Sequence, residues 1–75
     1  MAKEFDREII KQYGVYGETP TGWTKEVNLV SWNGAEPKID IRTWSPGYEK
    51  TTKGITLNIT EARALANILL EIEEE

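Results

Sequence analysis

Three turn signals divide the first sixty residues of this chain and leave extended stretches between them. Proline presets φ for a turn, and glycine or asparagine accepts positive φ. The turn signals are Thr19-Pro20-Thr21-Gly22, Asn33-Gly34 and Ser45-Pro46-Gly47. The stretches between them hold most of the β-branched and aromatic residues, which predicts strands at residues 8–17, 22–33, 37–45 and 53–58. Connections this short join neighbouring antiparallel strands, so we expect a four-stranded antiparallel meander.

A helix is predicted directly after the last strand. The run Asn58-Ile59-Thr60-Glu61 has the pattern of a capping box, in which the first side chain accepts from N–H groups of the first turn and the last reaches back. Apolar residues follow at helical spacing, namely Ala62, Leu65, Ala66, Leu69 and Ile72, and Ala64 and Ile68 widen the stripe. The predicted fold is therefore α+β, a four-stranded antiparallel meander followed by one C-terminal helix.

The length of the chain limits how well this fold can be stabilised. Seventy-five residues have room for one domain, residues 1–75. A domain of this size buries only about 60% of the surface that its unfolded chain exposes. The apolar helix stripe is also wider than one small sheet face needs. We therefore expect a homodimer in which part of the helix meets a partner subunit.

The absence of Cys and His excludes several classes of function. A chain without either residue has no disulfide framework, no thiolate nucleophile, and neither the commonest general base nor the commonest metal ligand. No glycine-rich stretch leads into a helix as a phosphate-binding loop would. Glu36, Asp40 and Glu49 are candidate acids and bases, but their spacing favours solvated charges on strands. We expect a non-catalytic protein without a cofactor or a bound metal.

The formal net charge of −4 is concentrated at one end of the chain. Residues 1–60 hold eight basic and eight acidic side chains, whereas residues 61–75 hold one basic side chain and five acidic ones. The total acidity therefore does not exclude an anionic partner for the strands. No apolar run approaches the roughly 20 residues that span a bilayer, and the first eight residues lack the hydrophobic stretch of a signal peptide. We expect a cytoplasmic protein with no membrane partner.

Tryptophan on a polar strand face is the most unusual feature of the sequence. Alternation in the third predicted strand places Ile39, Ile41 and Thr43 on a core face and Lys38, Asp40, Arg42 and Trp44 on a solvated face. Trp32 shares a face with Asn28 if the second strand has no bulge. Aromatic rings stack nucleobases at about 1–3 kcal/mol each, and Lys and Arg neutralise phosphates. The pattern predicts an open face for single-stranded nucleic acid, and truncating Trp44 is expected to weaken binding with little effect on the fold.

Three lysines extend this predicted surface. Strict alternation places Lys25 on the face of Val27 and Leu29, where its position near the strand end lets the side chain reach water. A bulge would move Lys25 to the other face. Lys50 and Lys53 flank the loop into the fourth strand, where they could clamp a nucleic-acid backbone or serve solubility alone.

The residues alone leave other interpretations open. The tryptophans could instead be structural, packed under a loop or at a subunit interface. The same face could bind RNA, because stacking and phosphate contacts do not exclude a 2′-hydroxyl. Exposed tryptophans could also anchor a protein partner, which would make the chain a small protein-interaction module.

Two segments carry a resemblance to a known family. They are Ile39-Asp40-Ile41-Arg42 followed by an aromatic residue, and Lys53-Gly54-Ile55-Thr56-Leu57 entering the helix. Residues 22–33 and 36–46 extend the resemblance to about half of the chain. Through these segments the chain resembles the YdbC-like bacterial branch of the transcriptional coactivator family typified by positive cofactor four, or p15, whose members bind single-stranded DNA.

The resemblance implies a strand-strand-strand-strand-helix protomer that dimerises largely through its helices and presents a curved sheet to single-stranded DNA. In the family, positions matching Trp32, Lys38, Arg42 and Trp44 lie in or near the DNA-facing surface, and the lysine matching Lys53 belongs to its basic rim. The resemblance also implies a bacterial or phage-like, nucleoid-associated protein that acts in transcription regulation, replication or repair. The predicted DNA-binding residues are Lys25, Asn28, Trp32, Lys38, Arg42, Trp44, Lys50 and Lys53.

Overall fold

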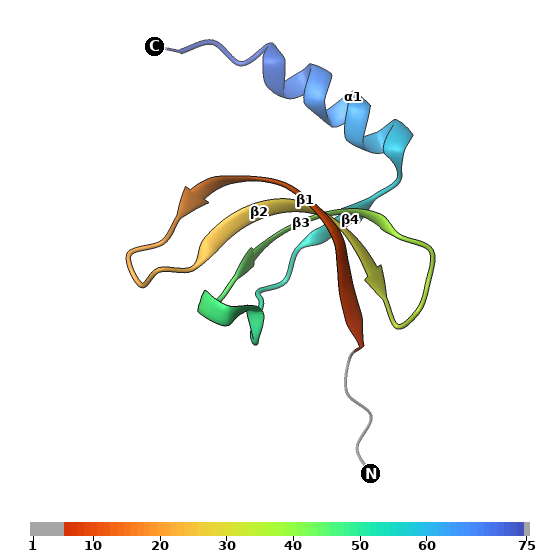
Figure 1. Ribbon diagram of the computed structural model, residues 1–75. Helices are drawn as coiled ribbons and strands as arrows, with labels where there is room; N and C mark the ends of the chain where they lie inside the picture. The colour runs from red at the N-terminus through yellow and green to blue at the C-terminus, as the bar shows by residue number, and fades with distance from the viewer. Residues whose placement is uncertain (1–5, 75) are drawn as a thin grey trace.

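A computed structural model, which describes residues 6–74, contains one curved antiparallel sheet and one α-helix (Figure 1). The elements are β1 (Arg7–Glu18), β2 (Thr24–Trp32), β3 (Lys38–Trp44), β4 (Ile55–Leu57) and α1 (Ile59–Leu70). Strands that are consecutive in the chain are neighbours in the sheet, in the order β1-β2-β3-β4. The predicted α+β fold, a four-stranded meander followed by a C-terminal helix, is confirmed. A short 3-10 helix, η1 (Pro46–Tyr48), lies between β3 and β4 and was not predicted.

The sheet has two faces with different side chains. Pairing between β2 and β3 runs without a bulge from Thr24 opposite Trp44 to Val30 opposite Lys38, so alternate residues keep to one face. The face that we call the polar face carries Glu26, Asn28, Trp32, Asp40, Arg42 and Trp44. The opposite face, the helix face, carries Val27, Leu29, Ile39, Ile41 and Leu57. Figure 1 shows α1 on one side of the curved sheet and η1 on the other.

The helix begins as its sequence predicts. The Asn58 side chain accepts a hydrogen bond from the Glu61 backbone N–H at 2.7 Å, and the Glu61 side chain accepts from the Asn58 backbone N–H at 3.0 Å. This reciprocal pair confirms the capping box and satisfies two backbone donors at the helix start. The chain between residues 6 and 74 has no helix that is both long and apolar enough to cross a membrane.

The helix covers its face of the sheet only thinly. A hollow of about 170 Å³ lies between sheet residues such as Ile41 and helix residues such as Leu65 and Leu69. None of the residues of α1 is buried, and Ile68 and Leu69 of the apolar stripe are 63% and 52% exposed. One protomer therefore leaves much of the apolar stripe of α1 in contact with water.

The polar face is the more deeply buried one, so the expectation that it is solvated is wrong, although Ile39 is buried on the helix face as expected. Glu26, Asn28, Asp40 and Trp44 all have no exposed surface, whereas Val27, Leu29 and Ile41 on the helix face are half-buried. Glu26, Asn28 and Asp40 tolerate this burial because each donates or accepts hydrogen bonds on this face. The segment around η1 and the side chain of Arg7 lie over them.

Removing the helix cap should destabilise the protein measurably. Asn58→Ala leaves the Glu61 N–H without its side-chain acceptor, so we expect the free energy of unfolding to fall by about 1 kcal/mol. Urea denaturation followed by far-UV circular dichroism measures the loss. Asn58→Asp is the matched control, because its carboxylate keeps the acceptor and should retain the wild-type stability. An unchanged Asn58→Ala variant would show that the cap contributes nothing.

Candidate nucleic-acid interface

An open groove on the polar face brings together three of the predicted residues. Trp32 from the end of β2, Arg42 from β3 and Lys53 from the segment before β4 line a groove of about 500 Å³. Thr51, Thr52 and Thr56 complete its lining. The guanidinium carbon of Arg42 lies 4.5 Å from the centre of the Trp32 ring, which is within the range of a cation–π interaction. The groove thus combines an aromatic ring with two cations and hydroxyl groups.

A buried carboxylate holds the ring and one of the cations. The indole Nε1–H of Trp32 donates to Asp40 Oδ2 at 3.1 Å, and the Nε–H of Arg42 donates to Asp40 Oδ1 at 2.6 Å. Asp40 has no exposed surface, so its interpretation as a solvated strand charge is wrong. The physical reason is that its two partners lie over it and supply the donors that a buried carboxylate requires. In the part of the chain that the structure describes, no three Asp or Glu side chains are grouped to hold a metal ion.

The segment before β4 is brought close to Arg42 by a glycine. A Cβ atom placed on Gly54 would lie 2.3 Å from the Ile41 carbonyl oxygen and 2.4 Å from the Arg42 Cβ, too close for any side chain. The absence of a side chain at Gly54 therefore lets the backbone pass directly over β3. This contact places Lys53 at the edge of the groove.

Trp44 lies under the surface instead of on it, contrary to the expectation from alternation. Its side chain is fully buried, and its ring stacks against Trp32 with 6.3 Å between centroids and 9° between planes. Tyr48 lies 5.6 Å away at a tilt, and the guanidinium carbon of Arg7 lies 5.3 Å from the ring centre. Trp44 therefore supports Trp32 from within the protomer. Truncating it to Ala is expected to cost about 3–5 kcal/mol of stability, which corrects the expectation of a small effect on the fold.

A second buried carboxylate anchors η1 to the sheet. Glu26 accepts hydrogen bonds from Gln12, Thr24, Asn28 and Tyr48. Burial opposes ionisation of Glu26, but the four hydrogen bonds outweigh it and lower the pKa of the carboxyl. The hydrogen bond to Glu26, burial and the nearby negative charge all raise the pKa of the Tyr48 hydroxyl. The ionised carboxylate therefore holds Tyr48, and with it η1, against the polar face.

Arg7 holds the same helix from the other side. Its Nη2 donates to the backbone carbonyls of Tyr48 and Glu49. Tyr48 has a φ of 66°, and Gly47 before it has a φ of 80°. A left-handed conformation at a bulky residue is unfavourable on its own. The hydroxyl contact with Glu26 and the carbonyl contact with Arg7 stabilise it.

Two predicted residues lie away from the groove because of their position in β2. Asn28 is fully buried and donates to Glu26 at 3.1 Å. Lys25 pairs with Thr43 in the unbulged ladder and belongs to the helix face, where it is exposed at the strand end. A Cβ placed on Gly17 would lie 3.2 Å from the Lys25 Cδ, so the aliphatic stem lies against β1. A DNA-binding role of either residue stays a prediction.

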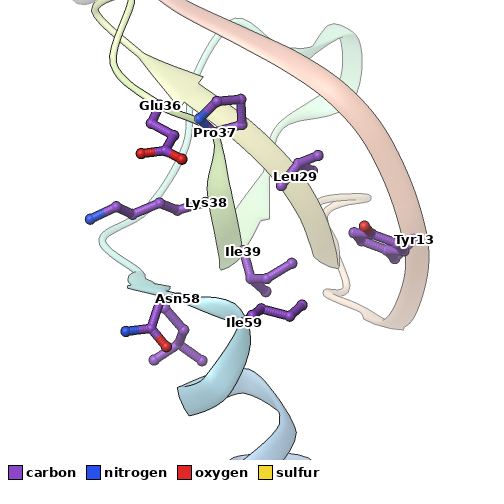
Figure 2. A pocket seen from close by; sticks show the side chains of 9 residues that line it. Tyr13, Leu29, Glu36, Pro37, Lys38, Ile39, Asn58 and Ile59 are labelled. Atoms are coloured by element: carbon purple, nitrogen blue, oxygen red, sulfur yellow. The ribbon is translucent and has the colours of Figure 1, made fainter.

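The remaining two lysines are exposed but also outside the groove. Lys38 lies at the start of β3 and lines a different hollow, of about 310 Å³, with Tyr13 and Ile59 (Figure 2). Figure 2 shows its side chain extending away from Ile39. Lys50 lies in the loop after η1, where its backbone N–H donates to the Ser45 hydroxyl at 2.9 Å. Their roles in binding are likewise predictions.

Several residues of the site were missed from the sequence. No sequence pattern predicted a role for Glu26, Tyr48 or Arg7, because their contacts join segments that are 14 to 41 residues apart. A pattern did exist for Asp40. It lies two residues from Arg42 on the same strand face, and opposite charges at that spacing can meet. Alternation therefore contained the information for the Asp40–Arg42 pair, although not for its burial.

The part of the chain that contains the groove is similar in sequence to known proteins. A family model described as Transcriptional Coactivator p15 (PC4) matches residues 19–68, which include β2, β3, β4 and most of α1. An uncharacterized protein of Treponema pallidum (strain Nichols) is 39% identical over 66 residues, covering 88% of this chain and 78% of the Treponema protein. All residues that line the groove fall within the range of the family model.

The stability of the protein should decrease in acid through Glu26. A carboxyl whose pKa is lowered by folding contributes stability above its unfolded value of about 4.5, and that contribution is lost as the pH falls through the folded pKa. We expect Glu26→Gln to be less stable than the wild type at neutral pH. Its free energy of unfolding should also decrease less steeply than that of the wild type as the pH falls below about 4.5. Urea denaturation across this pH range measures both. Glu36→Gln, at an exposed position, is the control. Parallel curves for Glu26→Gln and wild type would contradict the assignment.

Proposed function

Because the chain belongs to the transcriptional coactivator p15 (PC4) family, we propose that it binds single-stranded DNA and catalyses no reaction. The observation that carries the proposal is the groove in which Trp32, Arg42 and Lys53 meet. An indole ring stacks on any base, and the two cations neutralise phosphates. Because stacking and phosphate contacts are made with every base alike, we expect little sequence preference. We place this activity in transcription regulation, as the description of the family indicates.

The charge of the groove limits the electrostatic part of the binding. Residues 22–56 hold five basic and four acidic side chains, and the Arg42 charge is paired with Asp40. The acidic residues Glu71, Glu73 and Glu74 follow the end of α1, on the helix side of the sheet (Figure 1). Affinity should therefore depend on stacking at least as much as on charge. Two cations per protomer in a dimer correspond to a slope of log K against log salt of roughly −3 for a single strand.

Groove variants should separate residues that bind DNA from those that do not. We expect Trp32→Ala to weaken binding of labelled oligo-dT by about 1–3 kcal/mol, because one stacking contact is lost. Lys53→Ala should weaken binding and make the salt slope shallower by about 0.7, the contribution of one phosphate contact. Lys25→Ala removes the same charge from the helix face and tests whether that predicted residue also contributes to binding. Fluorescence anisotropy at several salt concentrations gives each dissociation constant.

The outcomes distinguish the alternatives. No binding of oligo-dT by the wild type at low salt would refute the proposed function. If Lys25→Ala lowers the affinity for oligo-dT as much as Lys53→Ala does, the DNA path is not confined to the groove. Competition between DNA and RNA oligomers of matched sequence decides whether a 2′-hydroxyl is accepted.

The proposed binding unit is a homodimer joined through α1. The supporting observation is apolar surface that one protomer leaves exposed, including Ile59, Ile68, Leu69 and Leu70 of the helix and its immediate start. So many exposed apolar side chains on one short helix are characteristic of an interface. Two protomers related by twofold symmetry would offer two grooves to one strand.

A charge on the exposed helix face should dissociate that dimer. Ile68 is 63% exposed in the protomer, so Ile68→Lys should leave the protomer folded while it disfavours burial of the face in a partner. Light scattering across dilution should give twice the chain mass for the wild type and one chain mass for Ile68→Lys. Asn67→Lys adds the same charge at the neighbouring polar position and should remain dimeric. A monomeric wild type at micromolar concentration would remove the dimer from the proposal.

A further inference from the structure

We propose that Asp40 is a positioning residue of the groove, whose buried carboxylate sets the orientation of Trp32 and Arg42 before DNA arrives. The inference rests on the proposed function and adds to it a residue that does not itself touch DNA. Asp40 has no exposed surface, so a nucleic acid lying in the groove cannot reach it. Asp40 can therefore affect binding only through its two partners or through its charge, without touching DNA itself.

The geometry divides the carboxylate between the two partners. One oxygen accepts from the indole Nε1–H of Trp32 at 3.1 Å, and the other accepts from the Nε–H of Arg42 at 2.6 Å. Hydrogen bonds to an ionised group are the stronger kind. The backbone of Asp40 is held on both sides, since it pairs with Asn28 in β2 and with Thr56 in β4. A carboxylate on a strand inside the sheet is thus a rigid reference point for two groove side chains.

The contact through Nε also decides which atoms Arg42 can offer to DNA. Because Nε faces Asp40, the terminal nitrogens are directed elsewhere, and Nη1 donates to the Thr52 carbonyl at 3.4 Å. A phosphate oxygen can replace so long a contact at little cost. The Arg42 side chain is 14% exposed, so it is mostly covered by its neighbours but still in contact with solvent. Ordering long side chains costs free energy on binding, and a groove that holds them in place avoids part of that cost.

The charge of Asp40 argues for the opposite effect. A carboxylate beside Arg42 neutralises the cation and repels phosphate, so on electrostatic grounds alone its removal should strengthen binding. Positioning and charge neutralisation therefore predict changes of opposite sign for the same substitution. Asn has nearly the shape of Asp but carries an NH2 group in place of one oxygen, so one of the two donors would lose its acceptor.

Binding of oligo-dT by Asp40→Asn tests the proposal. We expect binding about tenfold weaker than that of the wild type, as for partial loss of one stacking contact. The salt slope should also become shallower, because a released Arg42 contacts phosphate less often. Glu49→Gln is the matched control, since it removes one negative charge at an exposed position and should leave binding unchanged or slightly tighter. Binding by Asp40→Asn that equals or exceeds that of the wild type would overturn the proposal.

A double-mutant cycle shows whether Asp40 acts through Trp32. Trp32→Phe keeps an aromatic ring but removes the N–H that Asp40 accepts, so Asp40→Asn should cost less in that background than in the wild type. Strict additivity would overturn the positioning role toward Trp32. All variants are compared at a temperature at which circular dichroism shows each to be folded. A variant that is merely destabilised loses active protein but keeps the wild-type salt slope.

The binding measurements distinguish a failure of the proposed function from a failure of the positioning role of Asp40. If the wild type does not bind oligo-dT, the proposed function and this inference both fail. If the wild type binds and Asp40→Asn binds as tightly, the proposed function stands and only the positioning role is refuted.

Discussion

Glu26 and Asp40 lie on one face of the sheet with no surface exposed, and each of their carboxylates accepts hydrogen bonds at both oxygens. A buried carboxylate is tolerated only when donors replace the water that it has lost. Here those donors come from β1, β2, β3 and η1. The hydrogen bonds to the two carboxylates therefore connect most of the elements on this face. The arrangement of the aromatic rings and of the segment that carries η1 depends on these contacts.

This constraint explains why the two faces of the sheet differ. The polar face is closely packed because directional hydrogen bonds hold Tyr48 and Arg7 against it, where both also contact the ring of Trp44. The helix face meets α1 through apolar side chains and keeps a hollow beneath α1. A well-ordered polar face suits the display of a groove, and an incompletely covered apolar face suits association with a second copy.

The local parts of the structure could be predicted from the sequence. Asn33 and Gly34 have φ values of 54° and 76°, as the turn that they predict requires, and the Asn58–Glu61 capping box forms between residues three apart. Alternation also grouped Trp32 with Arg42 on one face correctly, because the β2–β3 ladder has no bulge. Burial could not be predicted in this way. Trp44 contacts side chains from β1, β2 and η1, and Asp40 contacts Trp32 of β2, which alternation within β3 does not describe.

By itself, the sequence determined the order of the elements, the turns, the helix start and the residue types available for binding, because each depends on neighbours in the chain. Only the tertiary structure decided which of those residues face the groove. It brought Lys53 beside Arg42 through the close approach at Gly54, placed Lys25 on the opposite face, and buried Trp44 beneath Trp32. The physical reason is that exposure is a property of what lies over a residue, and in this protein the covering groups come from distant parts of the chain.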